Sequence, residues 1–290
     1  MPIRINEPLS KHTRFATGGP ADIFFEPADE NELIEFLHAH GDTPITVLGL
    51  GSNVLVRDGG IRGAVIKLSS PYFKKIEVAG DTITAYAGAP NILVANAATD
   101  AGLSGFEFLA LIPGTIGGAI PTNAGCFGQD ISGVLQEVEV LDLKTLEKKI
   151  LTHEELNFGY RHSGLDPESR LILKATMKGT PEAPEKISAT IAANKAQKSA
   201  TQPVAEKTAG STFKNPSAPN PPAYKLIQDV GLQGVEIDGA KFSPLHANFL
   251  INTGTANSAA LENLIELAQQ KVKEKFNITL EPEIKILGEK

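Results

Sequence analysis

An uncharged, glycine-rich stretch in the middle of the chain limits what this sequence can fold into. Residues 108–128 contain five glycines, two prolines and no charged residue. So many glycines cost conformational entropy that packing alone does not recover. A membrane-spanning helix would hardly accommodate them. We interpret the stretch as backbone that approaches a large ligand closely, with a series of buried turns between domains as the alternative.

A shorter glycine loop, residues 49–53, precedes this stretch. It lies between apolar runs at residues 45–48 and 64–68, which predict strands. A dinucleotide fingerprint needs a third glycine at the sixth position, where this chain has Val54, so a Rossmann site is disfavoured. Taken alone, the loop is better explained by a tight turn. Two strand-flanked loops that can present backbone N–H groups together favour a phosphate-bearing cofactor.

The remaining pattern predicts an α+β protein. Helical periodicity and strand patterns are mixed without strict βαβ alternation. A chain of 290 residues corresponds to two domains or three small ones, and Pro203 marks a boundary because proline disfavours helix in the residue before it. The predicted helices cover residues 30–40, 92–101, 183–200, 224–230 and 258–275, and the main strand patterns cover residues 76–78, 83–86, 138–141 and 171–173.

Composition excludes some classes of protein. Lys and Arg number 27 against 34 Asp and Glu, so the net charge is −7, which argues against a general nucleic-acid binder. The single cysteine, Cys126, cannot form an intramolecular disulfide, which fits a reducing compartment. The amino terminus lacks the apolar core of a secretory signal. We therefore expect a soluble, cytoplasmic protein.

Three segments place charged or hydroxyl residues among small or rigid ones, at residues 159–163, 209–216 and 280–284. Each is weak evidence alone, because a serine after glycine is usually a turn residue and a glutamate after proline usually lies at the surface. The chain has no Gly-x-Ser-x-Gly elbow, and Cys126 has no local partner signature, so a hydrolase is disfavoured. The six histidines show no metal-ligand spacing, and no metal is assigned.

Taken together and in this order, these segments resemble the UDP-N-acetylenolpyruvoylglucosamine reductase family, flavin enzymes of bacterial cell-wall precursor synthesis. The resemblance spans nearly the whole chain. The pieces that carry it are residues 13–15, 18–22, 49–53, 112–118, 123–125, 160–163, 209–216, 239–243, 246–249 and 280–283.

The resemblance implies an α+β fold with a vanillyl-alcohol-oxidase-type FAD-binding domain and a C-terminal α+β substrate-binding domain. The two FAD-binding subdomains would be residues 1–70 and 71–200, and the substrate domain residues 201–290. FAD is the implied cofactor, with both glycine loops around its pyrophosphate and isoalloxazine. The implied cofactor-binding residues are Gly49, Leu50, Gly51, Ser52, Asn53, Ile112, Pro113, Gly114, Thr115, Gly117, Gly118, Asn123, Ala124 and Gly125.

The implied chemistry has two half-reactions. NADPH reduces FAD, and hydride then passes to the enolpyruvyl methylene carbon of UDP-N-acetylglucosamine enolpyruvate. Arg161 is implied to hold the substrate carboxylate, Ser211 to donate the proton and Glu283 to assist enol formation in its protonated form. A serine is a poor acid, so Ser211 needs neighbours that stabilise its alkoxide. The implied substrate-binding residues are Tyr160, Arg161, Lys214 and Asn215. Of the last two, Asn215 is the better candidate for a substrate ligand.

The chain departs from the family pattern at a few positions. Thr122 stands where methionine is common, and Lys195 and Lys198 lie where arginine is usual. Little room is left between Lys178 and Ala209 for the extra substrate loop of longer members, which indicates the shorter type. Two alternatives stay open: another FAD oxidoreductase of this fold, and a non-catalytic FAD or nucleotide-sugar binder. We expect no nucleic-acid or membrane partner and leave the oligomeric state open, a monomer being compatible.

Overall fold

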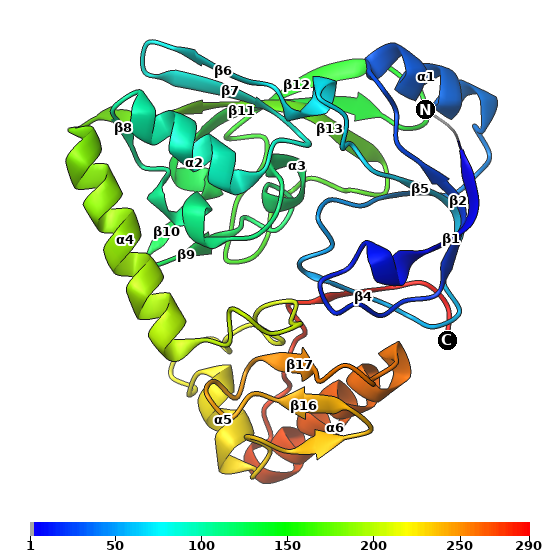
Figure 1. The fold of residues 1–290 in the computed structure, drawn as a ribbon, viewed down its shortest axis with the longest axis vertical. Coiled ribbons are helices and arrows are strands. Elements are labelled where there is room, and N and C mark those ends of the chain that lie inside the picture. Colours follow the sequence, from blue (N-terminus) through cyan, green and yellow to red (C-terminus); the bar gives the residue numbers. More distant parts are fainter. Residues whose placement is uncertain (1–2) are drawn as a thin grey trace. The chain divides into compact units, whose positions relative to one another are not determined.

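The computed structural model describes residues 3–290 (Figure 1). The chain divides into two compact units, each built from separate stretches of sequence. Of the described residues, the first unit comprises residues 3–4, 23–50 and 63–196, and the second comprises residues 5–22, 51–62 and 197–290. Each unit has its own hydrophobic core of buried side chains.

The first unit is organised around an antiparallel sheet with the strand order β12-β11-β13-β7-β6. Strand β7 alternates buried and more exposed side chains, with Ile83 and Ala85 buried. This alternation places one row of side chains in the core and the other on the opposite face. The strands are β6 (Ile76–Ala79), β7 (Thr82–Tyr86), β11 (Leu135–Asp142), β12 (Lys148–Thr152) and β13 (Arg170–Lys178).

Helices α2 (Asn91–Asp100) and α3 (Ile116–Ala119) lie on one side of this sheet (Figure 1). Helix α1 (Glu30–Ala39) begins where the side chain of Asp29 accepts a hydrogen bond from Glu32 N at 3.0 Å, and it buries Leu33, Phe36 and Leu37. The shorter elements of this unit are η2 (Tyr72–Lys74), β8 (Leu103–Ser104), η3 (Glu107–Leu111), β9 (Gly125–Cys126), β10 (Gln129–Asp130), η4 (Ile131–Gly133) and β14 (Thr180–Pro181).

A second, four-stranded sheet has the order β1-β2-β5-β3. Its strands are β1 (Arg4–Pro8), β2 (Pro20–Phe25), β3 (Ile45–Val47) and β5 (Ile61–Ile66), and β3 is parallel to β5. The boundaries between the two units fall within β1, β2 and β5 along the chain. A further boundary falls within the long helix α4 (Pro184–Thr201).

In the second unit, a small sheet of order β15-β16-β17 is accompanied by two helices (Figure 1). Helix α6 (Ser258–Phe276) is capped by Asn257, ends at Asn277 in the left-handed conformation and buries Leu261, Leu264 and Ile265 among others. The other elements are η1 (Leu9–Lys11), β4 (Val54–Val56), α5 (Ala223–Asp229), β15 (Glu236–Ile237), β16 (Ala240–Phe242), β17 (Leu250–Asn252) and β18 (Lys285–Leu287), which pairs with β4 in parallel.

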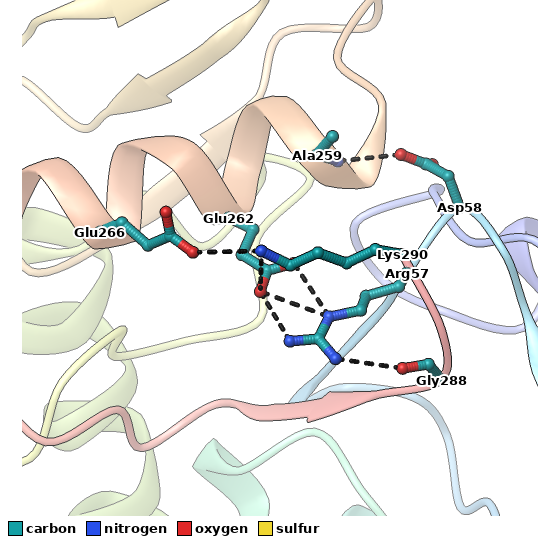
Figure 2. Close-up of polar contacts among 7 residues, drawn as sticks. All are labelled: Arg57, Asp58, Ala259, Glu262, Glu266, Gly288 and Lys290. Atoms are coloured by element: carbon teal, nitrogen blue, oxygen red, sulfur yellow. Dashed lines mark hydrogen bonds and ion pairs between the residues drawn. The ribbon is translucent and has the colours of Figure 1, made fainter.

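The end of β4 is tied to α6 by a cluster of charged groups (Figure 2). Arg57 donates from Nη2 to Glu262 Oε1 at 2.7 Å, from Nε to Glu262 Oε2 at 3.0 Å, and from Nη1 to the carbonyl of Gly288 at 3.2 Å. The carboxylate of Asp58 accepts hydrogen bonds from the backbone of Ser258 and Ala259 at the start of α6. Residues 51–62 are therefore held to the C-terminal part of the chain by paired charges.

We expect that the Glu262→Gln variant unfolds a few degrees below the parent at neutral pH, because the buried carboxylate loses its charge opposite Arg57. Hydrogen bonding from Arg57 lowers the pKa of Glu262 from its usual 4.5. This stabilisation is present above the unfolded pKa and is lost as pH falls through the lower folded pKa. Thermal unfolding at several pH values should show a difference in Tm that narrows below about pH 4.5.

The exposed Glu266→Gln is the matched control, because Glu266 lies on the same helix and its ion pair with Lys290 is exposed to solvent. It is expected to leave Tm unchanged. A Tm difference for Glu262→Gln that stays constant on acidification would contradict the assignment to the Arg57 ion pair.

The predicted helices are confirmed as α1, α2, α4, α5 and α6, and the strand patterns as β3, β5, β6, β7, β11 and β13.

One expectation about the second glycine loop is wrong. The second glycine loop is not flanked by strands: the 3-10 helix η3 precedes it, and the short helix α3 begins inside it. The apolar residues around it are buried on the helical side of the sheet, and short apolar runs do not distinguish strand from helix. Within residues 3–290 no helix is long and apolar enough to cross a membrane.

Candidate active site

The first glycine loop connects β3 to β4, and its shape depends on Gly51. Gly51 has φ +64°, and a Cβ there would lie 2.0 Å from the carbonyl oxygen of His12. The Gly51 carbonyl in turn accepts a hydrogen bond from Arg14 N at 2.9 Å. The loop is therefore packed against residues 12–14, at a distance that excludes every side chain. Along the chain, residues 49–50 belong to the first unit and residues 51–53 to the second.

The second loop is held by a buried asparagine at the start of α2. Asn91 is 1% exposed; its backbone N–H donates to the carbonyl of Gly114 at 3.0 Å, and its Nδ2 donates to the carbonyl of Ile112 at 3.1 Å. Gly117 is packed so closely on the sheet that a Cβ would lie 2.9 Å from the Cβ of Ala87. The loop is thus fixed from both sides by the body of the first unit.

The two glycine loops meet at Thr115 within the first unit. A Cβ on Gly49 would lie 3.0 Å from Thr115 Oγ1, and a Cβ on Gly118 would lie 3.6 Å from the same atom. Thr115 precedes α3, but its side chain does not cap that helix. The result is glycine backbone on both sides of a hydroxyl group, which a side chain at Gly49 would crowd. Such a cradle fits the phosphate oxygens of a dinucleotide, so the residues present are compatible with FAD.

Residues 121–125, at the end of this loop, contact residues 159–163, which include a turn at residues 159–162. Asn123 Nδ2 donates to the carbonyl of Gly159 at 3.1 Å, and Ser163 Oγ donates to the carbonyl of Pro121 at 3.2 Å. Arg161 Nη2 donates to the carbonyl of Gly125 at 2.9 Å. The structure therefore brings the end of the second loop together with the predicted substrate arginine.

Tyr160 lies beside Arg161 in the same turn. Tyr160 is 57% exposed, and the guanidinium carbon of Arg161 lies 5.3 Å from the centroid of its ring. Arg161 is itself partly exposed and has φ +54°, an uncommon conformation for an arginine. This turn presents a cation and an aromatic ring on the surface of the first unit.

Ser211 and Glu283 lie on neighbouring extended segments of the second unit. Residues 211–213 bridge to Phe249 on one side and to Pro282 on the other. Glu283 N donates to the carbonyl of Thr212 at 2.8 Å. The two predicted catalytic residues are thus brought together by main-chain hydrogen bonds. Arg161 belongs to the first unit.

Two buried residues fix the Ser211 segment. Asn248 is 4% exposed, and its side chain accepts from Phe213 N at 3.0 Å and donates to the Phe213 carbonyl at 2.8 Å. Thr212 is fully buried, and its hydroxyl accepts a hydrogen bond from Leu250 N at 3.2 Å. These contacts give hydrogen-bond partners to the N–H and carbonyl of Phe213 and to the N–H of Leu250, and buried main-chain groups need such partners.

The first glycine loop reaches Glu283 through Asn53. Asn53 Nδ2 donates to the carbonyl of Glu283 at 3.2 Å, and the Asn53 carbonyl accepts from Lys285 N at 3.0 Å. The predicted substrate ligands also contact the protein. Lys214 pairs with the carboxylate of Glu281, and Asn215 Oδ1 accepts from Ala223 N at 3.0 Å at the start of α5.

His246 lies next to this segment and is half-buried between rings. Its ring centroid is 5.3 Å from that of Tyr224 and 4.9 Å from that of Phe249. Burial lowers the pKa of His246 from its usual 6.5. The ring is therefore neutral at physiological pH, and Nδ1 accepts from Asn248 N at 3.3 Å. A neutral imidazole keeps this side of the Ser211 segment free of added positive charge.

Two family models match the chain. Residues 21–145 match a model described as FAD binding domain, and residues 202–287 match the C-terminal domain of UDP-N-acetylenolpyruvoylglucosamine reductase. The predicted α+β fold, with its vanillyl-alcohol-oxidase-type FAD-binding domain and separate C-terminal domain, is confirmed. The fold and the glycine loops define an FAD-dependent oxidoreductase.

Relatives match over nearly the whole length. UDP-N-acetylenolpyruvoylglucosamine reductases from Caulobacter vibrioides and Phenylobacterium zucineum are 45% and 46% identical, with 98% of this chain and 94% of each relative covered. The crystal structure of the reductase from Thermus caldophilus superposes with a TM-score of 0.84 and 32% identity, covering 99% of this chain and 100% of that one. The chain belongs to the UDP-N-acetylenolpyruvoylglucosamine reductase family, and the family resemblance and the shorter type are confirmed.

Sequence analysis missed three residues that shape the site: Asn91, Thr212 and Asn248. All three are buried polar side chains that bond to main-chain groups, Asn91 to the second glycine loop, Thr212 to Leu250 in β17 and Asn248 to Phe213. Asn248 lies in a segment that carried the resemblance, but its role depends on a partner 35 residues away. A local pattern does not reveal such contacts.

Proposed function

We propose that the protein reduces the enolpyruvyl group of UDP-N-acetylglucosamine enolpyruvate to the lactyl ether of UDP-N-acetylmuramate, with NADPH as the electron donor, in peptidoglycan precursor synthesis. Similarity to reductases over 98% of the chain supports this substrate. The structural observation that carries the proposal is the hydrogen bond of 2.8 Å between Glu283 N and the Thr212 carbonyl, because it holds the segment of Glu283 beside the segment of Ser211.

The cofactor would be held by the two glycine loops, residues 49–53 and 112–125. When bound, FAD takes two electrons from NADPH and supplies hydride to the methylene carbon of the enolpyruvyl group. The side-chain-free cradle at Thr115 would receive the pyrophosphate. The contacts of Asn91 with Ile112 and Gly114 keep this cradle in shape before the cofactor arrives.

Arg161 would bind the carboxylate of the enolpyruvyl group. As negative charge develops beside that carboxylate, a permanently charged guanidinium stabilises it, and the fork of N–H donors orients the carboxylate plane. Tyr160, exposed beside Arg161, would line the same subsite. Lys214 and Asn215 would contact the nucleotide-sugar from the second unit.

Ser211 would deliver the proton that completes the reduction. Hydride adds to the methylene carbon, the double bond becomes an enol or enolate, and the adjacent carbon takes a proton from the Ser211 hydroxyl. Glu283, in its protonated form, would donate a hydrogen bond or proton to the carboxylate oxygen and so assist formation of the enol. The proximity of the two segments allows both groups to act on one substrate.

The predicted division into residues 1–70, 71–200 and 201–290 stays a proposal. The C-terminal family model, residues 202–287, supports the last part as the substrate domain. The cytoplasmic location and a monomeric state are kept as predictions. An oxidase of the same fold and a non-catalytic binder are the competing functions, and the experiment below separates them.

An anaerobic absorbance titration tests this function. NADPH is expected to bleach the flavin band of the purified protein, and UDP-N-acetylglucosamine enolpyruvate is then expected to restore it. A flavin band that NADPH bleaches but the enolpyruvyl sugar does not restore would overturn the proposed substrate. An oxidase would instead be bleached by an alcohol or hydroxy acid and restored by oxygen, and a binder would show no change with either addition.

A further inference from the structure

We propose that Asn123 is a positioning residue for Arg161, and that its amide serves the turn at residues 159–162 instead of contacting FAD. This inference rests on the role proposed above for Arg161. The residue lies in the second glycine loop, where the sequence implied a cofactor ligand.

The side-chain amide of Asn123 forms hydrogen bonds with other groups of the protein. Nδ2 donates to the carbonyl of Gly159 at 3.1 Å and to Asp130 Oδ2 at 3.2 Å, and Oδ1 accepts from Ser132 N at 3.0 Å. Both N–H groups of the amide therefore have partners, and the residue is 3% exposed. No N–H group of this side chain is left to bind a cofactor oxygen.

The turn that Asn123 contacts is under strain. Gly159 and His162 exchange two backbone hydrogen bonds, of 3.0 and 3.2 Å, and Arg161 between them has φ +54°. A left-handed arginine persists only where surrounding contacts determine the backbone. The carbonyl of Gly159 receives both the His162 N–H and the Asn123 amide, so the side chain completes the closure of the turn.

Three contacts attach residues 159–163 to residues 121–125 at alternate positions. They are the bonds from Ser163 to Pro121, from Asn123 to Gly159 and from Arg161 to Gly125. The Arg161 bond uses its own guanidinium, which would also bind substrate, and Ser163 lies beyond the turn. The bond from Asn123 to the Gly159 carbonyl thus holds the backbone of the turn and leaves the Arg161 side chain available for substrate.

The test uses two variants that separate the partners of Asn123. In Asn123→Asp, the carboxylate keeps the bond from Ser132 N but cannot donate to Gly159 and repels Asp130. The double variant N123D/D130N restores a donor–acceptor pair between positions 123 and 130, and Asn at 130 can still accept from the Ser132 hydroxyl. The double variant leaves the Gly159 carbonyl without the donor from position 123, with only the His162 N–H. Gln129→Ala, at an exposed position of β10, is the control.

We expect the double variant to regain the parent's Tm and to bind FAD with the parent's affinity, measured by thermal unfolding and by flavin fluorescence. Its kcat/KM for the enolpyruvyl sugar is expected to stay about 10- to 100-fold low, because the turn carrying Arg161 is loosened. The reduction of bound FAD by NADPH should stay much closer to the parent rate. Gln129→Ala should match the parent in all readouts.

Parental kcat/KM in the double variant would overturn the inference, since the Gly159 contact would then have no consequence. Weakened FAD affinity in a variant of parental Tm would overturn it too, and would assign Asn123 to the cofactor. The variant Arg161→Lys is measured alongside. If it lowers kcat/KM while the double variant does not, only this inference fails. If neither variant lowers kcat/KM, the role of Arg161 fails with it.

Discussion

Replacing Ser211 by alanine is expected to stop reduction of the enolpyruvyl sugar while FAD still binds and is still reduced by NADPH. A general acid contributes about 10²- to 10⁴-fold to a rate, and we expect a loss in that range. Alanine keeps the backbone bridge of position 211 to Phe249, so the segment should stay in place. Stopped-flow absorbance under anaerobic conditions measures the two half-reactions separately.

The matched control is Ser217→Ala, at an exposed position six residues further along the same segment. It should leave both half-reactions at the parental rate. Unchanged turnover in Ser211→Ala would remove Ser211 as the proton donor. A variant that loses FAD or unfolds at a lower temperature would instead point to a structural role.

Arg161→Lys is expected to lower kcat/KM for the enolpyruvyl sugar by about 10²- to 10³-fold, the loss typical when one donor to a developing negative charge is removed. Lysine keeps the positive charge but loses the planar fork, so it cannot bind a carboxylate through two parallel bonds while also donating to the Gly125 carbonyl. Steady-state kinetics with FAD-saturated protein give the value.

The control for Arg161→Lys is Arg170→Lys, which changes an arginine at the start of β13 in the same unit. It is expected to leave kcat/KM unchanged. An Arg161→Lys variant with parental kcat/KM would mean that the guanidinium does not hold the substrate carboxylate, and the exposed Tyr160 beside it would lose its proposed subsite as well.

The two glycine loops show how much of the local structure can be predicted from the sequence. For the first loop the sequence alone favours a tight turn, and the structure supplies the reason for Gly51, a carbonyl oxygen of His12 that lies 2.0 Å from where a Cβ would be. The residues around Gly117 were expected between strands, but they lie between a 3-10 helix and a short α-helix. Apolar glycine-rich stretches have no period that separates these possibilities.

The roles of the two loop asparagines depend on distant partners. Asn53 and Asn123 both stand in loops that the sequence assigns to a cofactor. In the structure their amides donate to the carbonyls of Glu283 and Gly159, which are 230 and 36 residues away. A sequence pattern reports residue type and spacing, but hydrogen bonds between distant segments form only in the folded chain.

The sequence by itself determined the family, the flavin cofactor and the α+β class, and it proposes Arg161, Ser211 and Glu283 as catalytic residues, because each depends on residue types in a fixed order along the chain. Only the tertiary structure decided how those residues are supported. It placed Ser211 beside Glu283 through Thr212, and it joined residues 51–62 to the C-terminal part through Arg57 and Glu262, which are 205 residues apart. The physical reason is that buried polar groups must find hydrogen-bond partners wherever the fold brings them, and those partners are rarely neighbours in sequence.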